Sequence, residues 1–392
     1  MWPAGLPHID LNQDPTMLVS EISLFSIAIP LQVEFAHHLF SRRTSDSLIV
    51  LSRDTDGHVG YGEGVPRPYV TGETWAQAVS AAKKMALACK GNQFGNWEEL
   101  SSFLEKMAEH QLAKDAPSAW CAIELSILDL WSKRNKIPLW RLFIDKPQAK
   151  EFHYSASIPL FPLKRLEQIL KIVKEGLQID RVKLKVKGIN QGREALFLAR
   201  EILGAKSEIR VDANGAFDLE SALRFLELSK DASLTAIEQP VDKYDLTSFK
   251  EITERARIIT IADESMFATQ TPISLLDDGI CRGLNIRVSS CGGFMKSLSL
   301  AWDVIARGGI LQLGGHVGET SVLSAAARHL AAVVGHVRFM EGAASKYLYS
   351  FDISRQDISF GKKGYAPLLD GSGLGIEINE ELLSQRATAI NY

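Results

Sequence analysis

The spacing of strand-like runs is the feature that most constrains the fold of this chain. From the second run to the seventh, each run starts 23 to 27 residues after the one before it. Amphipathic stretches such as 219–229 and 295–306 separate the runs. Repeated strand–helix units of this length require parallel strands joined by helical crossovers. The sequence therefore predicts an α/β fold, a (β/α)8-type (TIM-like) barrel. The runs start at Phe152, Arg181, Glu208, Thr235, Ile258, Gly283, Gly309 and Val337.

An open doubly wound sheet is the alternative architecture for alternating strands and helices. Such a sheet usually carries a glycine-rich fingerprint between its first strand and the following helix. The string GYGEG from Gly60 is too short for that fingerprint and precedes no helical stretch. The barrel is therefore favoured.

The first third of the chain has a different pattern. Three β-prone runs, 18–30, 47–53 and 58–62, come before any helical pattern. Strands first and helices afterwards, without alternation, indicate a separate α+β domain. Its predicted helices span 73–90, 97–110 (with Asn96 as the cap) and 115–134.

Composition argues against several kinds of partner. The 44 Lys and Arg residues against 47 Asp and Glu give a net charge of −3 without a long basic block, so we expect no nucleic acid binding. No run approaches the ~18 apolar residues of a membrane span, and the N-terminus lacks the pattern of a signal peptide. We therefore expect no membrane association and a cytoplasmic location. The four cysteines form no CxxC pair and are expected to be reduced and buried.

Three carboxylates end consecutive strands of the predicted barrel. Asp212, Glu238 and Asp263 follow one another at intervals of 26 and 25 residues. Converging anions repel one another unless a cation lies among them, and hard oxygen ligands favour Mg2+, with Mn2+ as a substitute. Taken singly, each acid could instead be a turn residue, a loop acid or a helix cap. Alternation points Asp263 the same way as the apolar Ile259 and Ile261, so this strand must end or bulge there.

Two lysines share one face of the preceding strand. Lys183 and Lys185 alternate with Val182 and Leu184, so the lysines point to one side and the apolar residues to the other. Chemistry in such barrels lies at the carboxyl ends of the strands. The lysines are therefore predicted to face the acids, although Lys-x-Lys is also common at a solvated strand edge.

At this point the motifs carry a family resemblance. The strings VKLKVKG, VDANGAF, IEQP, IADES, NIRVSSCGG and LLDGSGLGIEIN resemble, in this order, the enolase superfamily and its muconate-lactonizing-enzyme (muconate cycloisomerase) subgroup. The resemblance implies a modified barrel with a capping domain that the C-terminal segment completes. The corresponding boundaries are an N-terminal extension at 1–17, the capping domain at 18–135, the barrel at 136–345 and the returning segment at 346–392.

The resemblance also implies roles for the residues that match its motifs. Asp212, Glu238 and Asp263 would be the Mg2+ ligands, and Lys185 would abstract a proton α to the carboxylate of a small substrate. Relatives hold the resulting enediolate on the metal. Lys183 is predicted either to lower the pKa of Lys185 or to pair with one of the acids.

Arg287 departs from the family pattern. On the sixth strand the family normally places a second lysine, and arginine is a reluctant base because it stays protonated. We therefore expect a one-base reaction of the muconate-cycloisomerase type, in which Arg287 binds a carboxylate or stabilises the intermediate. The alternatives are an N-acylamino-acid racemase or dipeptide epimerase, an o-succinylbenzoate-synthase-like dehydratase, and a non-catalytic metal-binding barrel.

Further candidates surround these residues. Asn214 and Gln239 follow metal ligands and are predicted to orient the metal shell or the substrate. His316 and Glu319, in GGHVGET, are predicted substrate contacts, with general acid catalysis by His316 as an alternative.

The segment FAHHLFSRR, residues 35–43, resembles the mobile specificity loop of relatives. Its cations, including His38 and Arg43, suggest an anionic or polar substrate, although a solvated charged loop is an equal alternative. Relatives are commonly homo-oligomers, and the same is expected here.

Overall fold

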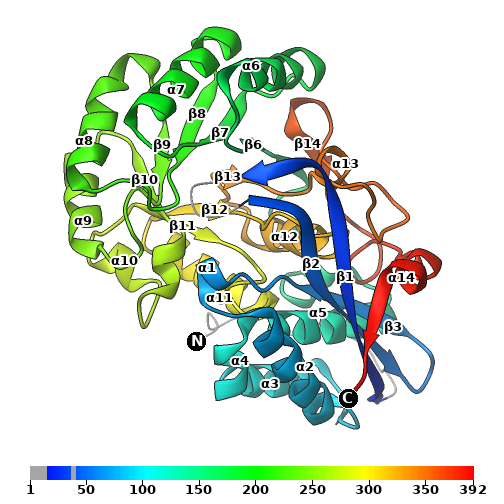
Figure 1. The fold of residues 1–392 in the computed structure, drawn as a ribbon. Helices are drawn as coiled ribbons and strands as arrows, with labels where there is room; N and C mark the ends of the chain where they lie inside the picture. The colour runs from blue at the N-terminus through cyan, green and yellow to red at the C-terminus, as the bar shows by residue number, and fades with distance from the viewer. Residues whose placement is uncertain (1–15, 37–40) are drawn as a thin grey trace.

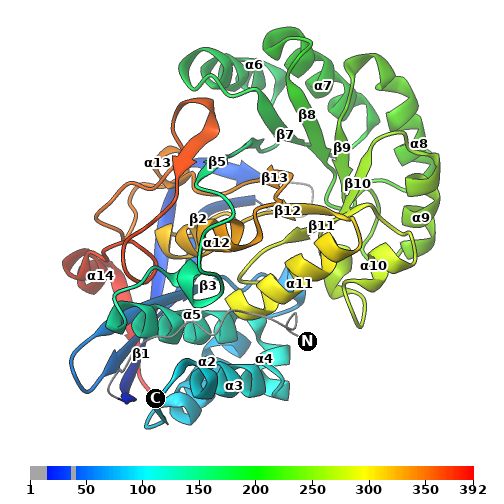
Figure 2. The same ribbon diagram turned by 180° about the vertical axis from the view of Figure 1, so that it is seen from behind.

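The computed structural model describes residues 16–36 and 41–392, with side chains described outside 33–42 (Figure 1). An antiparallel sheet with its helices lies beside a curled parallel sheet whose outer side carries helices (Figures 1 and 2). The predicted modified barrel with an α+β cap is confirmed.

The capping sheet is built mainly from the first three strands. β1 (Met17–Ala36) pairs antiparallel with β2 (Ser41–Asp54), which pairs with β3 (Val59–Gly64). The last strand of the chain, β15 (Ala387–Ile390), adds to the free edge of β1. β4 (Gln93–Phe94) pairs with the start of β1. The C-terminal segment therefore returns to the capping sheet, as the resemblance implied.

Helix α5 (Pro117–Arg134) lies close against β3, and the GYGEG string explains how. A Cβ atom at Gly62 would lie 1.9 Å from the Ala122 carbonyl oxygen, and Gly60 and Gly64 meet the same helix. These glycines serve backbone-to-backbone packing in the cap. The three predicted helices are confirmed, and Asn96 caps the second. The helices of the cap are α1 (Pro68–Thr71), α2 (Trp75–Cys89), α3 (Trp97–Ala108), α4 (Gln111–Asp115) and α5.

The barrel sheet contains eight parallel strands in sequence order. Seven of the predicted runs each provide one strand. The run from Phe152 divides: its first part, β5 (Glu151–His153), pairs antiparallel with β14 (Tyr365–Pro367), and only β6 (Ala156–Ile158) enters the barrel. The other strands are β7 (Arg181–Lys185), β8 (Glu208–Asp212), β9 (Ala236–Glu238), β10 (Ile259–Ala262), β11 (Gly283–Ile286), β12 (Ile310–Leu313) and β13 (Phe339–Met340).

Helices cover the outside of this sheet (Figure 2). The predicted helices at 219–229 and 295–306 are confirmed to within one residue at each end. Near the C-terminus two shorter helices follow, α13 (Ser345–Leu348) and α14 (Glu380–Arg386). The barrel helices are α6 (Leu163–Lys171), α7 (Ile189–Leu203), α8 (Leu219–Leu228), α9 (Leu246–Arg255), α10 (Ser274–Asp277), α11 (Phe294–Ala306) and α12 (Ser321–Val334).

Strand alternation divides the barrel residues into two sets. The outward residues, such as Val182 and Leu184, belong to the main hydrophobic core under the helices. Ile261 and Phe339 form a small separate cluster with Ala236, which fits the filled lower interior of a barrel. The inward positions beyond this cluster, toward the carboxyl ends of the strands, are polar.

Two expectations from composition can be compared with the structure. All four cysteines are buried and form no disulfide, as predicted. Within residues 16–36 and 41–392, no helix is both long and apolar enough to cross a membrane.

Candidate active site

A cavity of about 470 Å3 opens at the carboxyl ends of the barrel strands. It is bounded by the barrel, by α6 and α13, and by Gln32 and Tyr69 of the capping domain. Concave sites at this end of a barrel are the usual place for catalysis. Predicted site residues that line it are Lys183, Lys185, Asn214, Arg287, His316 and Glu319.

Lys185 lies at the end of β7, next to Asp212 on β8. Its Nζ is 2.5 Å from Asp212 Oδ2 and 2.7 Å from Asn214 Oδ1. Burial alone would raise the pKa of Asp212, but the ammonium groups of Lys185 and Lys183 outweigh burial and hold that pKa well below its ordinary value. Asp212 is therefore ionised.

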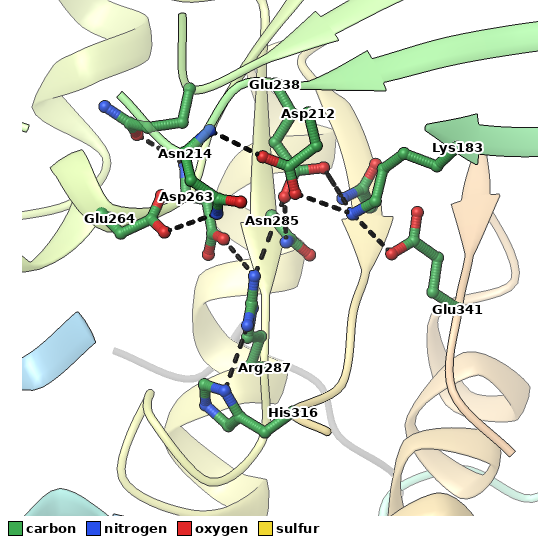
Figure 3. A network of polar contacts seen from close by, with 12 residues as sticks. Lys183, Asp212, Asn214, Glu238, Asp263, Glu264, Asn285, Arg287, His316 and Glu341 are labelled. Carbon is green, nitrogen blue, oxygen red and sulfur yellow. Dashed lines mark hydrogen bonds and ion pairs between the residues drawn. The ribbon is translucent and has the colours of Figure 1, made fainter. Parts of the chain in front are cut away.

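Lys183 lies one step deeper and is surrounded by carboxylates (Figure 3). Its Nζ is 2.6 Å from Glu341 Oε2, 2.8 Å from Glu238 Oε2 and 3.4 Å from Asp212 Oδ2. Burial lowers the pKa of Lys183, but these acids outweigh it and raise the pKa above its ordinary value. The contacts favour the second of the two predicted roles, that of an ion-pair partner for the acids.

Arg287 bridges an acid and a histidine (Figure 3). One terminal nitrogen contacts Asp263 Oδ2, and the other is 3.1 Å from His316 Nδ1. Because a guanidinium only donates, Nδ1 of His316 accepts. In the neutral imidazole the hydrogen is then on Nε2, which is 2.5 Å from Ser290 Oγ. Burial opposes the charge of Arg287, but Asp263 and Glu238 raise the pKa further above the ordinary arginine value.

Asp263 follows the end of β10, and the expected reason for its direction is wrong: Ile261 lies in the barrel interior, so alternation already points Asp263 inward. The strand ends at Ala262, and Asp263 turns at φ −122° and ψ −84° into a 3-10 turn at Glu264–Phe267. Gln239 Oε1 accepts the amide hydrogens of Asp263 and Ser265 at 3.1 and 3.0 Å. Gln239 therefore orients the acid-bearing turn, and its predicted role toward a metal shell or a substrate stays a prediction.

Two buried carboxylate oxygens in this cluster have no hydrogen-bond partner among the described residues. They are Oδ1 of Asp263 and Oε2 of Glu264. Burial, with the neighbouring acids, raises the pKa of both groups. Buried oxygens without partners fit a site for a divalent cation, because hard oxygen ligands suit Mg2+. Glu264, which Asn214 Nδ2 contacts at 2.9 Å, was not among the predicted metal ligands.

The acids around the mouth are close in the sheet but not clustered tightly. Asp212 and Glu238 are direct partners on β8 and β9. Among the residues with described positions, only Asp54, Asp56 and His58 of the cap bring one ligand atom each within 4.8 Å of one another. There, Arg134 Nη1 is 2.7 and 2.6 Å from the two aspartates and balances one of their two charges.

A layer of polar side chains lies below the mouth. Gln312 Nε2 donates to Glu238 Oε2 at 2.8 Å, and Asn285 Nδ2 donates to Glu238 Oε1 at 2.9 Å. Arg210 contacts Gln312 and lies 2.8 Å from Glu341 Oε1. Strand phase contained the signal, because Arg210 precedes Asp212 by two residues on the same face.

The remaining predicted substrate contacts have different outcomes. Glu319 lines the cavity, its Oε1 accepts the His316 amide hydrogen at 2.7 Å, and burial raises its pKa to about 8. Arg43 is exposed and is not among the described residues that line the cavity. His38 lies outside the described residues.

Known proteins match both parts of the chain. Residues 164–382, more than half of the 392 residues, match the family described as enolase C-terminal domain-like. A hydrophobic dipeptide epimerase from Enterococcus faecalis is 27% identical over 363 residues, covering 92% of this chain and 99% of that protein. An N-succinyl-L-Arg/Lys racemase from Bacillus cereus is 26% identical over 373 residues, covering 94% and 98%.

Solved structures give the same family. The Enterococcus faecalis dipeptide epimerase complexed with Mg and L-Leu-L-Tyr has a TM-score of 0.83 at 26% identity, covering 92% of this chain and all of that chain (100%). A muconate lactonizing enzyme from Pseudomonas fluorescens, complexed with muconolactone, has a TM-score of 0.84 at 18% identity, covering 95% and 100%, and shares the fold. The similar sequences described above are an epimerase and a racemase, so they do not support the predicted muconate-cycloisomerase subgroup. The chain belongs to the enolase superfamily, through its enolase C-terminal domain-like region.

Proposed function

We propose that the protein is a divalent-metal-dependent epimerase or racemase that removes and returns the proton α to the carboxylate of an N-acylated amino acid or a dipeptide. One observation carries the proposal: Lys185, on the cavity wall, has its Nζ 2.5 Å from Asp212, next to acids with oxygens that have no partner in the part of the chain that the structure describes. The names of the similar sequences, a dipeptide epimerase and an N-succinyl amino acid racemase, support the substrate class.

The acids at the mouth are proposed to hold the metal. Asp212, Glu238 and Asp263 supply hard oxygen donors from three neighbouring strands, and Glu264 adds a buried oxygen without a partner among the described residues. When bound, Mg2+ would withdraw charge from the substrate carboxylate and so acidify the α proton. Asn285 and Gln312 fix both oxygens of Glu238 by donating to them.

Lys185 is proposed as the base on one face of the substrate. Its Nζ contacts Asp212 Oδ2 and Asn214 Oδ1, two acceptors that fix the position of the amine. General base catalysis of this kind contributes about 10²–10⁴ in rate. Lys183 pairs with Glu238 and Glu341 and holds both side chains in place.

Proton return on the opposite face is assigned to the Arg287–His316 pair. β7 and β11 are four strands apart in the sheet order, so Lys185 and Arg287 come from opposite sides of an eight-stranded barrel. His316 is neutral because Arg287 donates to its Nδ1, and its Nε2 faces Ser290. To return a proton, His316 must first take one up at Nδ1 and so give up its contact with Arg287. The resulting imidazolium can release that proton near neutral pH, whereas a guanidinium cannot.

A second candidate is a one-base reaction, such as cycloisomerisation or dehydration. The observation that favours it is Arg287 itself, since its contacts with Asp263 raise its pKa and remove it as a base. In such a reaction Lys185 would act alone, and Arg287 would serve as a fixed cation beside the substrate carboxylate.

Solvent isotope exchange separates the two candidates. The protein is incubated with Mg2+ in deuterated water with single enantiomers of N-acylated amino acids and dipeptides, and both stereoisomers are analysed by mass spectrometry. Epimerisation places deuterium at the α carbon of both stereoisomers. Exchange confined to the starting stereoisomer, or consumption to a new product, favours the one-base reaction, and no exchange with any substrate would overturn the proposal.

A matched pair of variants then tests the second face. Ser290→Ala removes the hydroxyl that His316 Nε2 contacts, and His316→Gln removes the imidazole. If His316 returns the proton, His316→Gln loses inversion but retains exchange in the starting stereoisomer. Equal loss of both signals would contradict that assignment.

A further inference from the structure

The cavity extends away from the acids to the seam where the barrel closes. The parallel ladder runs from β6 to β13, and the link recorded between its two ends is the Ser155 amide, which donates to the Met340 carbonyl at 2.8 Å. The cavity reaches this seam past Ala156 and Gly342. A substrate held at the acids would therefore project part of its structure into the seam.

The seam walls are apolar. We call this part of the cavity the seam pocket, and define it by six residues. Side chains with this chemistry bind hydrocarbon groups by removing them from water. The six residues are Phe161, Ile169, Ile172, Val173, Tyr347 and Phe360.

Ile172 is the informative member of this wall. It is 56% exposed, although it belongs to a large apolar residue type, and it begins a π-helical segment at Ile172–Gly176 directly after α6. π-Helical turns inside helices are frequent at functional sites. An exposed isoleucine at the mouth of an apolar cavity would gain burial if a ligand covered it.

The charges along the cavity do not favour an ammonium group in the seam. The acids among the lining residues are Glu264, Glu319 and Glu341, and Glu341 is already paired with Lys183 and Arg210 at 2.6 and 2.8 Å. Apart from Glu341, which follows the seam residue Met340, the described charged lining residues on the seam side are the cations Arg165 and Lys346, and Lys346 is 3.3 Å from Asp357 Oδ2. A free α-ammonium would meet like charge there.

We propose that the seam pocket binds an apolar group of the substrate, either the acyl group or the side chain of an N-acylated amino acid, and disfavours a substrate with a free α-ammonium. This inference rests on the proposed function, because that function places the substrate carboxylate at the acids. The cavity, at about 470 Å3, lies within the range of about 300–1,000 Å3 typical of small-molecule sites.

Calorimetry on the full chain with Mg2+ tests the proposal without depending on turnover. One arm compares N-acetyl-, N-butanoyl- and N-hexanoyl-alanine, and the other compares N-acetyl derivatives of alanine, norvaline and norleucine. We expect affinity to rise about fourfold per added methylene in at least one arm, with an increasingly negative heat capacity change. The arm that responds identifies which group occupies the seam. Acetylating the amino group of alanyl-norleucine should strengthen its binding.

Ile172→Glu and Leu163→Glu are a matched pair for the same measurement. Leu163 and Ile172 are both large, exposed apolar residues, one at each end of α6. Of the two, only Ile172 is among the described residues that line the cavity. Ile172→Glu should flatten the dependence on chain length, and Leu163→Glu should retain it. The proposal would be overturned if affinity did not change with chain length in either arm, or if no compound bound. It would also be overturned if affinity depended on chain length equally in Ile172→Glu and in the wild type.

The outcome also separates this inference from the proposed function. Isotope exchange with N-acetylalanine reports on the function alone, because that substrate has no long apolar group. If exchange occurs but affinity does not depend on chain length, the proposed function is supported and the seam-pocket proposal is contradicted. If affinity depends on chain length but no exchange occurs, the seam-pocket proposal is supported and the proposed function is contradicted.

Discussion

Buried carboxylates occur in two environments in this protein, and the contrast separates structural acids from those of the candidate site. At the interface between cap and barrel, Glu63 accepts the amide hydrogens of Thr320 and Leu323 at the start of α12, at 2.9 to 3.1 Å. Glu124 accepts the Phe294 amide hydrogen at the start of α11, at 2.5 Å. Burial dominates at both positions and raises the pKa to about 7 for Glu63 and about 8 for Glu124.

At the barrel mouth the partners are side-chain cations. Burial opposes ionisation there too, but Lys185 and Lys183 outweigh it and lower the pKa of Asp212, and Lys183 and Arg210 do the same for Glu341. An acid whose partners are backbone amides and hydroxyls, such as Glu63, which also accepts from the Thr320 hydroxyl at 2.7 Å, can be neutral and still hold cap and barrel together. At Asp263 and Glu264, whose Oδ1 and Oε2 lack a partner among the described residues, burial and neighbouring acids instead raise the pKa, and such buried acids cost stability unless they serve a ligand. The difference lies in what surrounds the acid, not in its burial.

Removing the amine of Lys185 should have the largest effect. Lys185→Met is expected to reduce α-proton exchange by about 10²–10⁴-fold, because the proposed base is lost. Mass spectrometry of substrate in deuterated water measures this. Lys164→Met, at an exposed position on α6, is the control and should leave exchange unchanged. Undiminished exchange in Lys185→Met would show that the base is another residue.

Lys183 tests whether the mouth acids depend on cations. Lys183→Met leaves Glu238 and Glu341 buried with one partner fewer, and should lower the free energy of unfolding by about 3–5 kcal/mol. Denaturant unfolding at pH 7 measures it. The control Lys171→Met breaks a solvent-exposed pair with Glu167 and should have a far smaller effect. Similar effects for the two variants would remove the contrast between the two environments.

Strand phase made part of this site predictable. Lys183 and Lys185 alternate with residues of the main core, so their inward direction follows from the period of two. Asp212 and Glu238 are direct partners because their strands end in the same register. In parallel strands, register and phase are regular enough to be read from sequence.

Other features depend on contacts that no local pattern contains. Glu264 enters the site because the backbone turns at Asp263, directly after the strand. The pairing of Arg287 with His316 depends on how the segment after β12 folds back toward β11. The run from Phe152 divides because β14, more than 200 residues later, pairs with its first part. These are long-range packing outcomes, and only the structure contains them.

Glu63 should make stability depend on pH. Its raised pKa, from 4.5 to about 7, means that the folded state keeps its proton in a range where the unfolded state has released it. The free energy of unfolding should therefore fall as pH rises through this range, with about 3 kcal/mol from Glu63. Glu63→Gln should flatten the dependence by that amount, as measured by denaturant unfolding at several pH values. An unchanged slope would mean that Glu63 is ionised in the folded protein.

Asp218, like Glu63, accepts a backbone amide hydrogen at the start of a helix, but it is exposed. Its effect on the pH dependence of stability should be the smallest of those predicted here and opposite in sign to that of Glu63. Its Oδ1 accepts the Ser221 amide hydrogen at 2.8 Å at the start of α8, and this bond lowers the pKa of Asp218. Its contribution to stability should be present above the unfolded pKa and lost as pH falls through the folded pKa. NMR titration of the two carboxyls in one sample checks this directly. If Asp218 titrated above its ordinary value, as Glu63 should, the amide bonds rather than burial would set the direction, and the distinction between the two environments would fail.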